Sequence, residues 1–224
     1  MNTQNQNARA AIFAKLKSAP TLTDAKPLPE WQAWHSDDQN ERTTRFIEKM
    51  SACHAEIKCT SKETLIHCLT DLINQEGFKR VLVGDNNPLM PDLIAGCEQS
   101  HFAIYDQAIE TFKTSLFNEI DVGITFSQAG IADTGTLATI PGGSEPRALS
   151  LVPPTHIAII RESDIVSNFS ELMTTPFWTN AGWGTTPPTN LLLISGPSKT
   201  ADIQQTLAYG AHGPKRLIVF LVKE

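Results

Sequence analysis

The residues best suited to chemistry lie in one loop near the carboxyl end of the chain. They combine hydroxyls, a glycine and an ammonium group: Ser195, Gly196, Ser198, Lys199 and Thr200. The pattern over residues 191–222 predicts strand, loop, helix, loop and strand, which places this loop after a strand and at a helix start. Helix-start amides, the hydroxyls and the lysine charge can together bind a carboxylate or phosphate. A helix cap by Ser198 or Thr200, with Lys199 in solvent, explains the same residues.

Asp133 is the candidate for acid or base chemistry. It lies in the segment GIADTGTLAT, between two glycines and beside two threonines. A turn at this place can present the carboxylate to a cleft, where it would act as a base or as an anchor. The alternative is an Asx-type turn, in which Asp133 accepts hydrogen bonds from nearby backbone amides.

Arg147 and His212 complete the candidate site. Arg147 can bind a substrate carboxylate with two parallel hydrogen bonds, or it can form a surface ion pair with Glu145. His212 lies in a Gly-Ala-His-Gly-Pro loop and is the candidate for proton exchange at neutral pH, although a lone histidine is more often structural. His156, at the start of an apolar run, is a second histidine that can reach a cleft.

Several common catalytic and cofactor patterns do not occur in the sequence. The Ser198 loop is not a Walker loop, and neither Gly-x-Ser-x-Gly nor Gly-x-Gly-x-x-Gly is found. The four cysteines form no Cys-x-x-Cys pair and the six histidines no zinc pattern. We therefore expect no cofactor, no metal and no iron–sulfur cluster on this chain.

Charge and hydropathy limit the classes of partner and the cellular compartment that we expect for this protein. The formal net charge is −6, from 18 basic and 24 acidic residues, without the basic stripe that a nucleic-acid partner needs. No apolar run reaches the roughly 18 residues of a membrane span, and the polar first residues lack the apolar core of a signal peptide. We expect a cytoplasmic protein.

Residues 1–40 are expected to form an N-terminal extension and residues 41–224 a single domain. Residues 7–17 fit a short amphipathic helix. Three prolines then predict an extended tether that carries Trp31 and Trp34. We expect these two aromatic side chains to pack against the main body, because an exposed tryptophan pair is costly.

Helical and strand patterns alternate along residues 41–224. Helical spacing predicts helices over residues 41–57, 60–76, 109–117 and 164–173. The second of these helices would begin with a capping box of Thr60 and Glu63 and would end at Gly77. Apolar runs predict strands at 80–84, 101–105, 121–125 and 155–160. Residues 127–140 predict a hairpin, and residues 174–190 an irregular loop. The expected fold class is α/β with a mainly parallel sheet and some antiparallel strands.

Three blocks of this sequence resemble the lactate utilization protein C family, whose defining unit is the LUD domain. The blocks are GIADTGTLAT at 130–139, SLVPPTHIAII at 150–160, and SGPSKTADI followed by GAHGPKRL within 195–217. Two positions depart from the family pattern. Asp133 stands where many members have Glu, and Lys199 where Arg is common, so that both keep the charge but alter the reach of the group.

The resemblance implies a three-layer α/β fold similar to that of glucosamine-6-phosphate deaminase, ribose-5-phosphate isomerase and coenzyme A transferases. It also implies oxidation of L-lactate to pyruvate by a three-component bacterial system in which partner subunits carry the iron–sulfur clusters. We therefore expect an accessory subunit that binds a small carboxylate or phosphate, or a partner subunit. The alternatives are a stand-alone enzyme on a phosphorylated sugar or an acyl thioester, and an interaction module that docks through its N-terminal segment.

Overall fold

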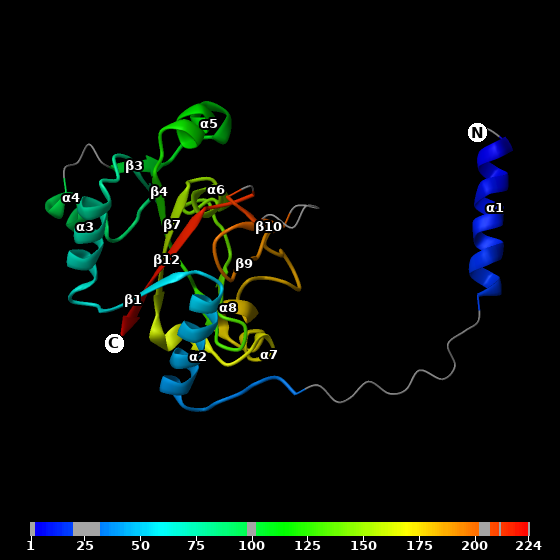
Figure 1. The fold of residues 1–224 in the computed structure, drawn as a ribbon, viewed down its shortest axis with the longest axis horizontal. Coiled ribbons are helices and arrows are strands. Elements are labelled where there is room, and N and C mark those ends of the chain that lie inside the picture. Colours follow the sequence, from blue (N-terminus) through cyan, green and yellow to red (C-terminus); the bar gives the residue numbers. More distant parts are fainter. Residues whose placement is uncertain (1–2, 20–31, 98–101, 202–206, 211, 224) are drawn as a thin grey trace. The chain divides into compact units, whose positions relative to one another are not determined.

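Apolar runs bounded by turns form a six-stranded sheet in the unit Ala33–Glu224 (Figure 1). The computed structural model describes residues 3–19, 32–97, 102–201, 207–210 and 212–223. The strand order is β1-β12-β7-β4-β2-β3, and every neighbouring pair is parallel. The predicted α/β class with a mainly parallel sheet is therefore confirmed. The strand bounds are β1 Glu56–Ser61, β2 Val81–Gly84, β3 Phe102–Tyr105, β4 Val122–Phe126, β7 Thr155–Arg161 and β12 Arg216–Lys223.

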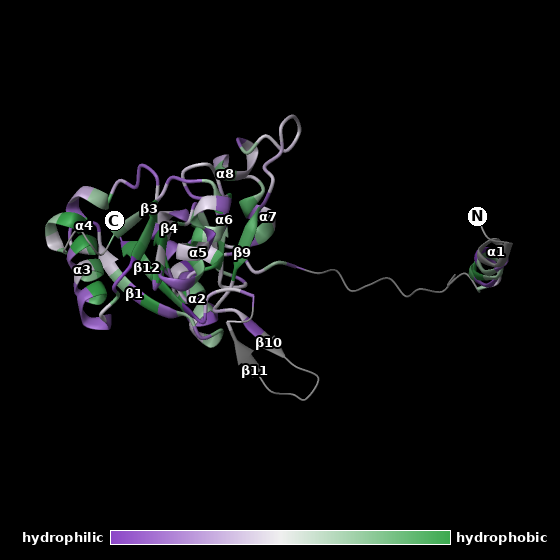
Figure 2. Cartoon of the chain, turned by 90° about the horizontal axis from the view of Figure 1, so that it is seen from above, coloured by the Kyte–Doolittle hydropathy of each residue, from purple (hydrophilic) through white to green (hydrophobic). Residues whose placement is uncertain are grey.

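One face of the central sheet is covered by α3 (Leu65–Glu76) and α4 (Met90–Gly96). Gly77 ends α3 with a left-handed φ of 66°, as the sequence predicts. Four residues at helical spacing form the buried stripe of α3: Leu65, Leu69, Leu72 and Ile73. Alternate residues of the strands meet this stripe, because neighbouring side chains of a strand point to opposite faces. Figure 2 shows these central strands in the hydrophobic colour.

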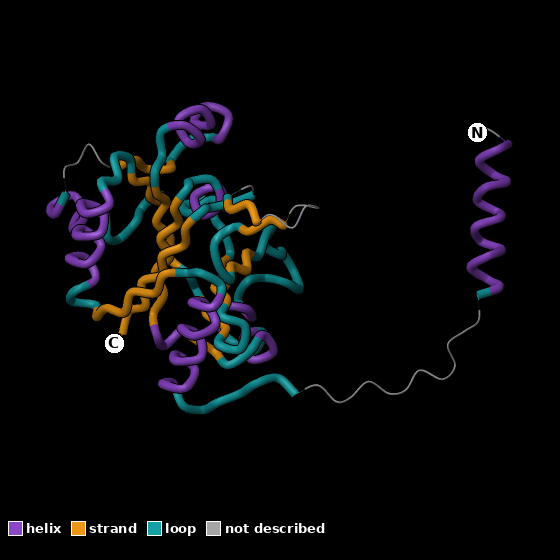
Figure 3. Tube along the Cα trace, in the orientation of Figure 1, coloured by secondary structure: helices purple, strands orange, loops and turns teal. Residues whose placement is uncertain are grey.

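The opposite face is covered by α2 (Gln39–Ala52), by the short helix α6 (Arg147–Leu151), by α5 (Ile109–Asn118) and by a second sheet. Phe46 and Met50 of α2 are fully buried against the strand residues that point this way. The three-layer arrangement follows, with helices on one face and a mixed layer on the other (Figure 3). This mixed layer supplies most of the candidate site.

The second sheet has the order β8-β5-β6-β9. Strands β5 and β6 pair antiparallel, which confirms the hairpin predicted for residues 127–140. Strand β9 pairs antiparallel with β6, so the run before Ser195 belongs to this small sheet and not to the parallel one. The bounds are β5 Ala129–Ile131, β6 Thr136–Thr139, β8 Ile165–Val166 and β9 Leu192–Ile194.

Two predicted helices are wrong in part. Residues 56–61 form β1, whereas helical spacing extended the first helix to residue 57 and began the next at Thr60. Residues 164–173 contain only the end of the 3₁₀ helix η2 (Glu162–Asp164), the two-residue strand β8 and the four-residue helix α7 (Phe169–Leu172). Strand pairing with β12 and with β5 overrides local helical patterns at these places.

The helix predicted after Ser198 is also wrong. Lys199–Ala201 form β10 and Leu207–Tyr209 form β11, and these two strands pair antiparallel as a separate hairpin. The hairpin extends from the body of the unit (Figure 2). The described residues that follow Ser198 therefore do not provide the helix-start amides expected for anion binding.

The unit Met1–Gln32 contains α1 (Thr3–Ser18), which confirms a helix over residues 7–17. Its apolar side chains Ile12, Phe13 and Leu16 are exposed. Trp31 lies outside the described residues. Trp34 packs against its own unit, where the Arg45 guanidinium carbon lies 4.6 Å from its ring centre. None of the described helices is long and apolar enough to span a lipid bilayer.

The loop over residues 174–190 contains one short helix, α8 (Pro176–Thr179). Trp178 stacks on Trp183 with ring centres 4.6 Å apart, and Phe169 meets Trp178 edge to face at 5.5 Å. These aromatic contacts hold the otherwise irregular segment beside α7.

Candidate functional site

A pocket of about 240 Å³ lies where the amino ends of β7 and β12 meet α6 and β9. Four of the residues predicted from the sequence line it together: Ser195, Gly196, Ser198 and His212. His156 and Ser150 also line it. The pocket thus gathers segments that lie far apart in the sequence, and its volume suits a metabolite smaller than a typical drug.

Ser198 is positioned by the backbone of the neighbouring loop. Its amide donates to the Pro214 carbonyl at 2.8 Å, and its carbonyl accepts from Gly210 at 3.0 Å. Its hydroxyl accepts from the His212 amide at 3.3 Å. The Ser198 amide is therefore occupied, and what remains for a ligand is the second lone pair and the proton of the hydroxyl.

A chain of hydroxyls joins Ser195 to the hairpin of the second sheet. Ser195 Oγ lies 2.8 Å from Thr136 Oγ1, which lies 2.7 Å from Thr134 Oγ1. Next to Ser195, a side chain on Gly196 would bring its Cβ within 2.6 Å of the Cys53 carbonyl oxygen. Close packing against the end of α2 therefore requires glycine at this position.

His156 forms the buried wall of the pocket. Its side chain is 1% exposed, and Nε2 lies 2.8 Å from Thr125 Oγ1. Nδ1 is buried and has no hydrogen-bond partner in the described part of the chain. Burial lowers the pKa of this imidazole to about 4, because the low-dielectric interior disfavours the charged ring. At neutral pH the ring is neutral and holds one unsatisfied polar atom beside the pocket.

Ser150 is a polar lining residue that the sequence did not single out. It is 4% exposed, and its hydroxyl donates to the Arg147 carbonyl within α6 at 3.1 Å. The helix has only five residues, too few for a periodic pattern to mark its inner face. The only signal in the sequence is its place at the start of the SLVPPTHIAII block.

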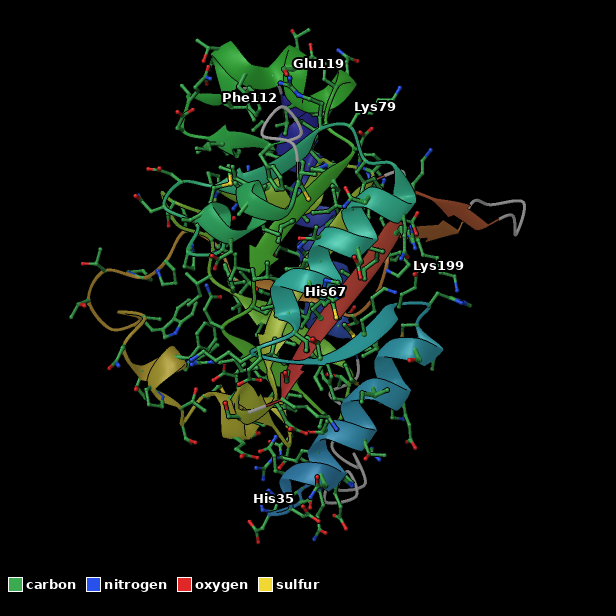
Figure 4. All side chains as sticks on the ribbon, turned by 90° about the vertical axis from the view of Figure 1, so that its left-hand side faces the viewer. His35, His67, Lys79, Phe112, Glu119 and Lys199 are labelled. Carbon is green, nitrogen blue, oxygen red and sulfur yellow. The ribbon has the colours of Figure 1, made fainter. Side chains whose placement is uncertain are left out.

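Two predicted ligand-binding residues, Lys199 and Arg147, are not among the residues that line this pocket. Lys199 is exposed on β10 (Figure 4). Thr200 is the middle residue of β10, and its side chain is outside what the structure describes. Arg147 is exposed and donates to the Asn190 side chain at 3.2 Å. The described ion pairs include none between Arg147 and Glu145, whose carboxylate instead accepts from the Phe126 amide.

Asp133 forms an ion pair with Arg45. Its carboxylate lies 2.8 Å from Nη2 of Arg45, and both side chains are largely buried, with exposed fractions of 20% and 30%. The guanidinium also stacks on Trp34, and Arg45 Nε is buried without a partner in the described residues. This ion pair joins α2 to the β5–β6 turn, and Asp133 is not among the described residues that line the pocket.

We expect Asp133→Asn to lower the free energy of unfolding by about 1–2 kcal/mol, because Arg45 loses its charged partner in a half-buried place. Because Asp133 is not among the lining residues, the affinity of the pocket for a ligand should change less than twofold. Urea unfolding measures the first quantity and ligand-dependent thermal shift the second. The matched control is Arg45→Gln, whose effect should not add to that of Asp133→Asn. Loss of ligand binding with unchanged stability would show that Asp133 serves the site.

The pocket combines a neutral histidine, three serine side chains and apolar residues such as Leu217. These groups can hold an oxygen-rich ligand by hydrogen bonds. Among the lining residues that the structure describes, no serine hydroxyl is hydrogen-bonded to a histidine ring, the contact by which a histidine activates a serine nucleophile. Across the described ranges no group of three or more His, Cys, Asp or Glu residues is placed to hold a metal ion.

Comparison with known proteins places these features in context. The LUD domain model matches residues 43–222. An uncharacterized protein of Neisseria meningitidis is 35% identical over 96% of this chain and 94% of its own length. Lactate utilization protein C 1 of Bacillus mycoides is 28% identical over 88% of this chain and 85% of its own length. A crystal structure of a DUF162 family protein from Deinococcus radiodurans matches 84% of this chain and 99% of that one, with a TM-score of 0.61 at 22% identity.

Proposed function

This chain belongs to the LUD domain family, and from that membership we propose that it takes part in lactate utilization as an accessory subunit that binds a small carboxylate. Relatives named lactate utilization protein C, such as the one from Halalkalibacterium halodurans at 28% identity over 89% of this chain, support the pathway. The iron–sulfur chemistry of L-lactate oxidation would then reside in partner subunits, because this sequence has no cysteine pattern for a cluster.

The observation that carries the ligand proposal is the pocket with its unsatisfied His156 Nδ1. A buried polar atom without a partner costs about 1–3 kcal/mol. A ligand group that reaches this nitrogen would remove that cost, and the hydroxyls of Ser195 and Ser198 would receive the oxygens of the ligand. L-lactate and pyruvate have the size and the oxygen atoms that such a pocket requires.

The binding test uses thermal stabilisation of the full chain by L-lactate and by pyruvate. A ligand with a Kd of about 1 mM stabilises the native state by roughly 1.4 kcal/mol at ten times that concentration. Ser198→Ala should weaken binding about tenfold, because the hydroxyl donates to a charged ligand oxygen. Ser51→Ala, an exposed serine in α2, is the matched control. Equal stabilisation of both variants, or none by either ligand, would contradict the site.

The accessory role is tested by assembly. The iron–sulfur subunits of a lactate oxidation system should co-purify with this chain and oxidise lactate more slowly without it. Residues 1–40 can be deleted in the same experiment to find whether the N-terminal segment makes the contact. Full activity of the partner subunits alone, with no co-purification, would contradict the proposal.

A further inference from the structure

The segment between β6 and α6 folds over the carboxyl ends of β2 and β4. Gly84, the last residue of β2, is packed so closely that a Cβ there would lie 2.3 Å from the Ser144 carbonyl oxygen and 2.7 Å from Glu145 Cγ. The Asp85 amide also donates to the Ser144 carbonyl at 2.9 Å. The position of Glu145 is therefore fixed by backbone contacts to the end of the central sheet.

The Glu145 carboxylate faces the end of β4. Its two oxygens lie 3.4 and 3.3 Å from the amide of Phe126, the last residue of that strand. The ion pairs of the described residues include none to Glu145. Burial without a cation raises the pKa of this carboxyl to about 7. Near neutral pH the group therefore exists in both protonation states and can donate or accept a hydrogen bond.

Asn87 supplies a second unusual group in the turn that follows β2. Its side chain is 8% exposed, and Oδ1 accepts from the Leu89 amide at 2.9 Å. Nδ2 is buried and has no partner among the described residues. Native proteins satisfy most buried donors, so an unpaired amide calls for a ligand or another explanation. Asn86, beside it, has a left-handed φ of 59°, which fixes the turn in an uncommon conformation.

The topology makes this edge the expected place for a ligand. The chain leaving β2 passes to α4 on the face that carries α3, whereas the chain leaving β4 passes to β5 on the opposite face. Strands β2 and β4 are neighbours in the sheet. The two connections therefore diverge from adjacent strands, and open α/β sheets bind ligands in the crevice outside such a switch point.

We propose that the carboxyl edge of β2 and β4, with Asn87 and Glu145 as its polar groups, is a second ligand site that takes a small molecule through an uncharged carbonyl or hydroxyl oxygen. Asn87 Nδ2 donates to that oxygen, and Glu145 donates to it or accepts from it. Asp85 adds a negative charge to the same turn, so a free carboxylate is disfavoured here. At Gly142 and Gly143 an added Cβ meets no atom within 4 Å, so the loop that leads to Glu145 is open to solvent at these two positions.

This site is separate from the pocket described above. His156 lies opposite Gly123 in β4, and Phe126 lies three residues further along that strand. At about 3.3 Å per residue the two places are roughly 10 Å apart along the sheet. The pocket lies at the amino ends of β7 and β12, whereas Glu145 lies beyond the carboxyl ends of β2 and β4.

The test is a titration of the full chain, labelled with ¹⁵N, with methyl L-lactate and with methyl pyruvate. Both esters offer carbonyl or hydroxyl oxygens and carry no charge. We expect saturable shifts of the Asn87 side-chain amide and the Phe126 backbone amide at millimolar ester. Asn87→Asp keeps the Oδ1 cap and the shape of the side chain but replaces the donor by an acidic oxygen, so it should weaken ester binding, read from the shift at Phe126, at least tenfold. Glu110→Gln, at an exposed position of α5, is the control.

Two outcomes would overturn the proposal. One is the absence of saturable shifts at either amide with tens of millimolar ester. The other is that Ser198→Ala, and not Asn87→Asp, removes the shifts, which would place the esters in the first pocket. Glu145→Gln provides a second variant of unchanged shape. Stabilisation by L-lactate without any ester effect would leave the proposed function intact and reject this site alone.

Discussion

Replacing Gly135 by alanine is expected to lower the free energy of unfolding by about 2–5 kcal/mol. Gly135 has a φ of 60° in the turn between β5 and β6, where an L side chain costs about 1–2 kcal/mol. An added Cβ would also lie 2.5 Å from Lys49 Cβ and 2.6 Å from the Met50 amide nitrogen. These atoms belong to α2, so relief requires the helix to move, which adds about 1–3 kcal/mol.

Gly77→Ala is the matched control for this substitution. Gly77 has nearly the same φ, 66°, but an added Cβ there meets nothing within 4 Å. Its replacement should therefore cost only the conformational part, about 1 kcal/mol. Urea unfolding of the two variants separates backbone strain from steric overlap. Equal losses would show that α2 does not pack on the β5–β6 turn as closely as the structure has it.

The second large effect is a change in the pH dependence of stability on replacing Glu145 by glutamine. In the folded chain the pKa of Glu145 is about 7, against an ordinary 4.5. The native state therefore binds more protons than the unfolded state between these pH values, and stability falls as pH rises from about 4.5 to 7. The full difference between the two pKa values corresponds to at most roughly 3 kcal/mol in the free energy of unfolding. Glu145 is partly exposed, and solvent screening therefore reduces the expected loss of stability to about 1–2 kcal/mol. Glu145→Gln should remove this loss and raise stability at pH 8.

His156 acts in the opposite direction over part of the same range. Burial lowers its pKa to about 4 from 6.5, so the unfolded state binds more protons between these values and stability rises with pH. In the Glu145→Gln variant this rise is unopposed, and stability should climb from about pH 4 to 6.5 and then level. Urea unfolding across pH measures the curve, with Glu110→Gln as control. An unchanged fall towards pH 7 in the variant would contradict the assignment to Glu145.

Local patterns were sufficient for much of the fold. The stripe of α3 and its Gly77 stop, the apolar run of β2 and the turn-rich hairpin of β5 and β6 each carry their signal within a dozen residues. Strand β1 does not, because Ile57 continues the helical spacing of α2 and only pairing with β12 makes it a strand. Such pairing joins residues too distant for a local pattern to reveal.

The sequence predicted several residues of the candidate site but not how the fold brings them together. Ser195, Ser198 and His212 were singled out from residue type and loop context, and the structure places them on one pocket. The reason for their meeting is tertiary, since Ser198 is held by the backbone of Pro214 and not by a helix start. The environment of Glu145 was hidden in the same way, because its burial depends on the close approach of Gly84.

The position of β12 has a consequence for how the protein acquires its fold during synthesis. This strand lies between β1 and β7, with Ile218 opposite both Glu56 and Ile157. Until residues 216–223 have left the ribosome, both neighbours present unpaired backbone edges, which are sites for pairing with other chains. The parallel contacts of β1 also span most of the sequence, a feature of slow folding. Nascent chains of this protein therefore expose both edges until the strand between them has been made.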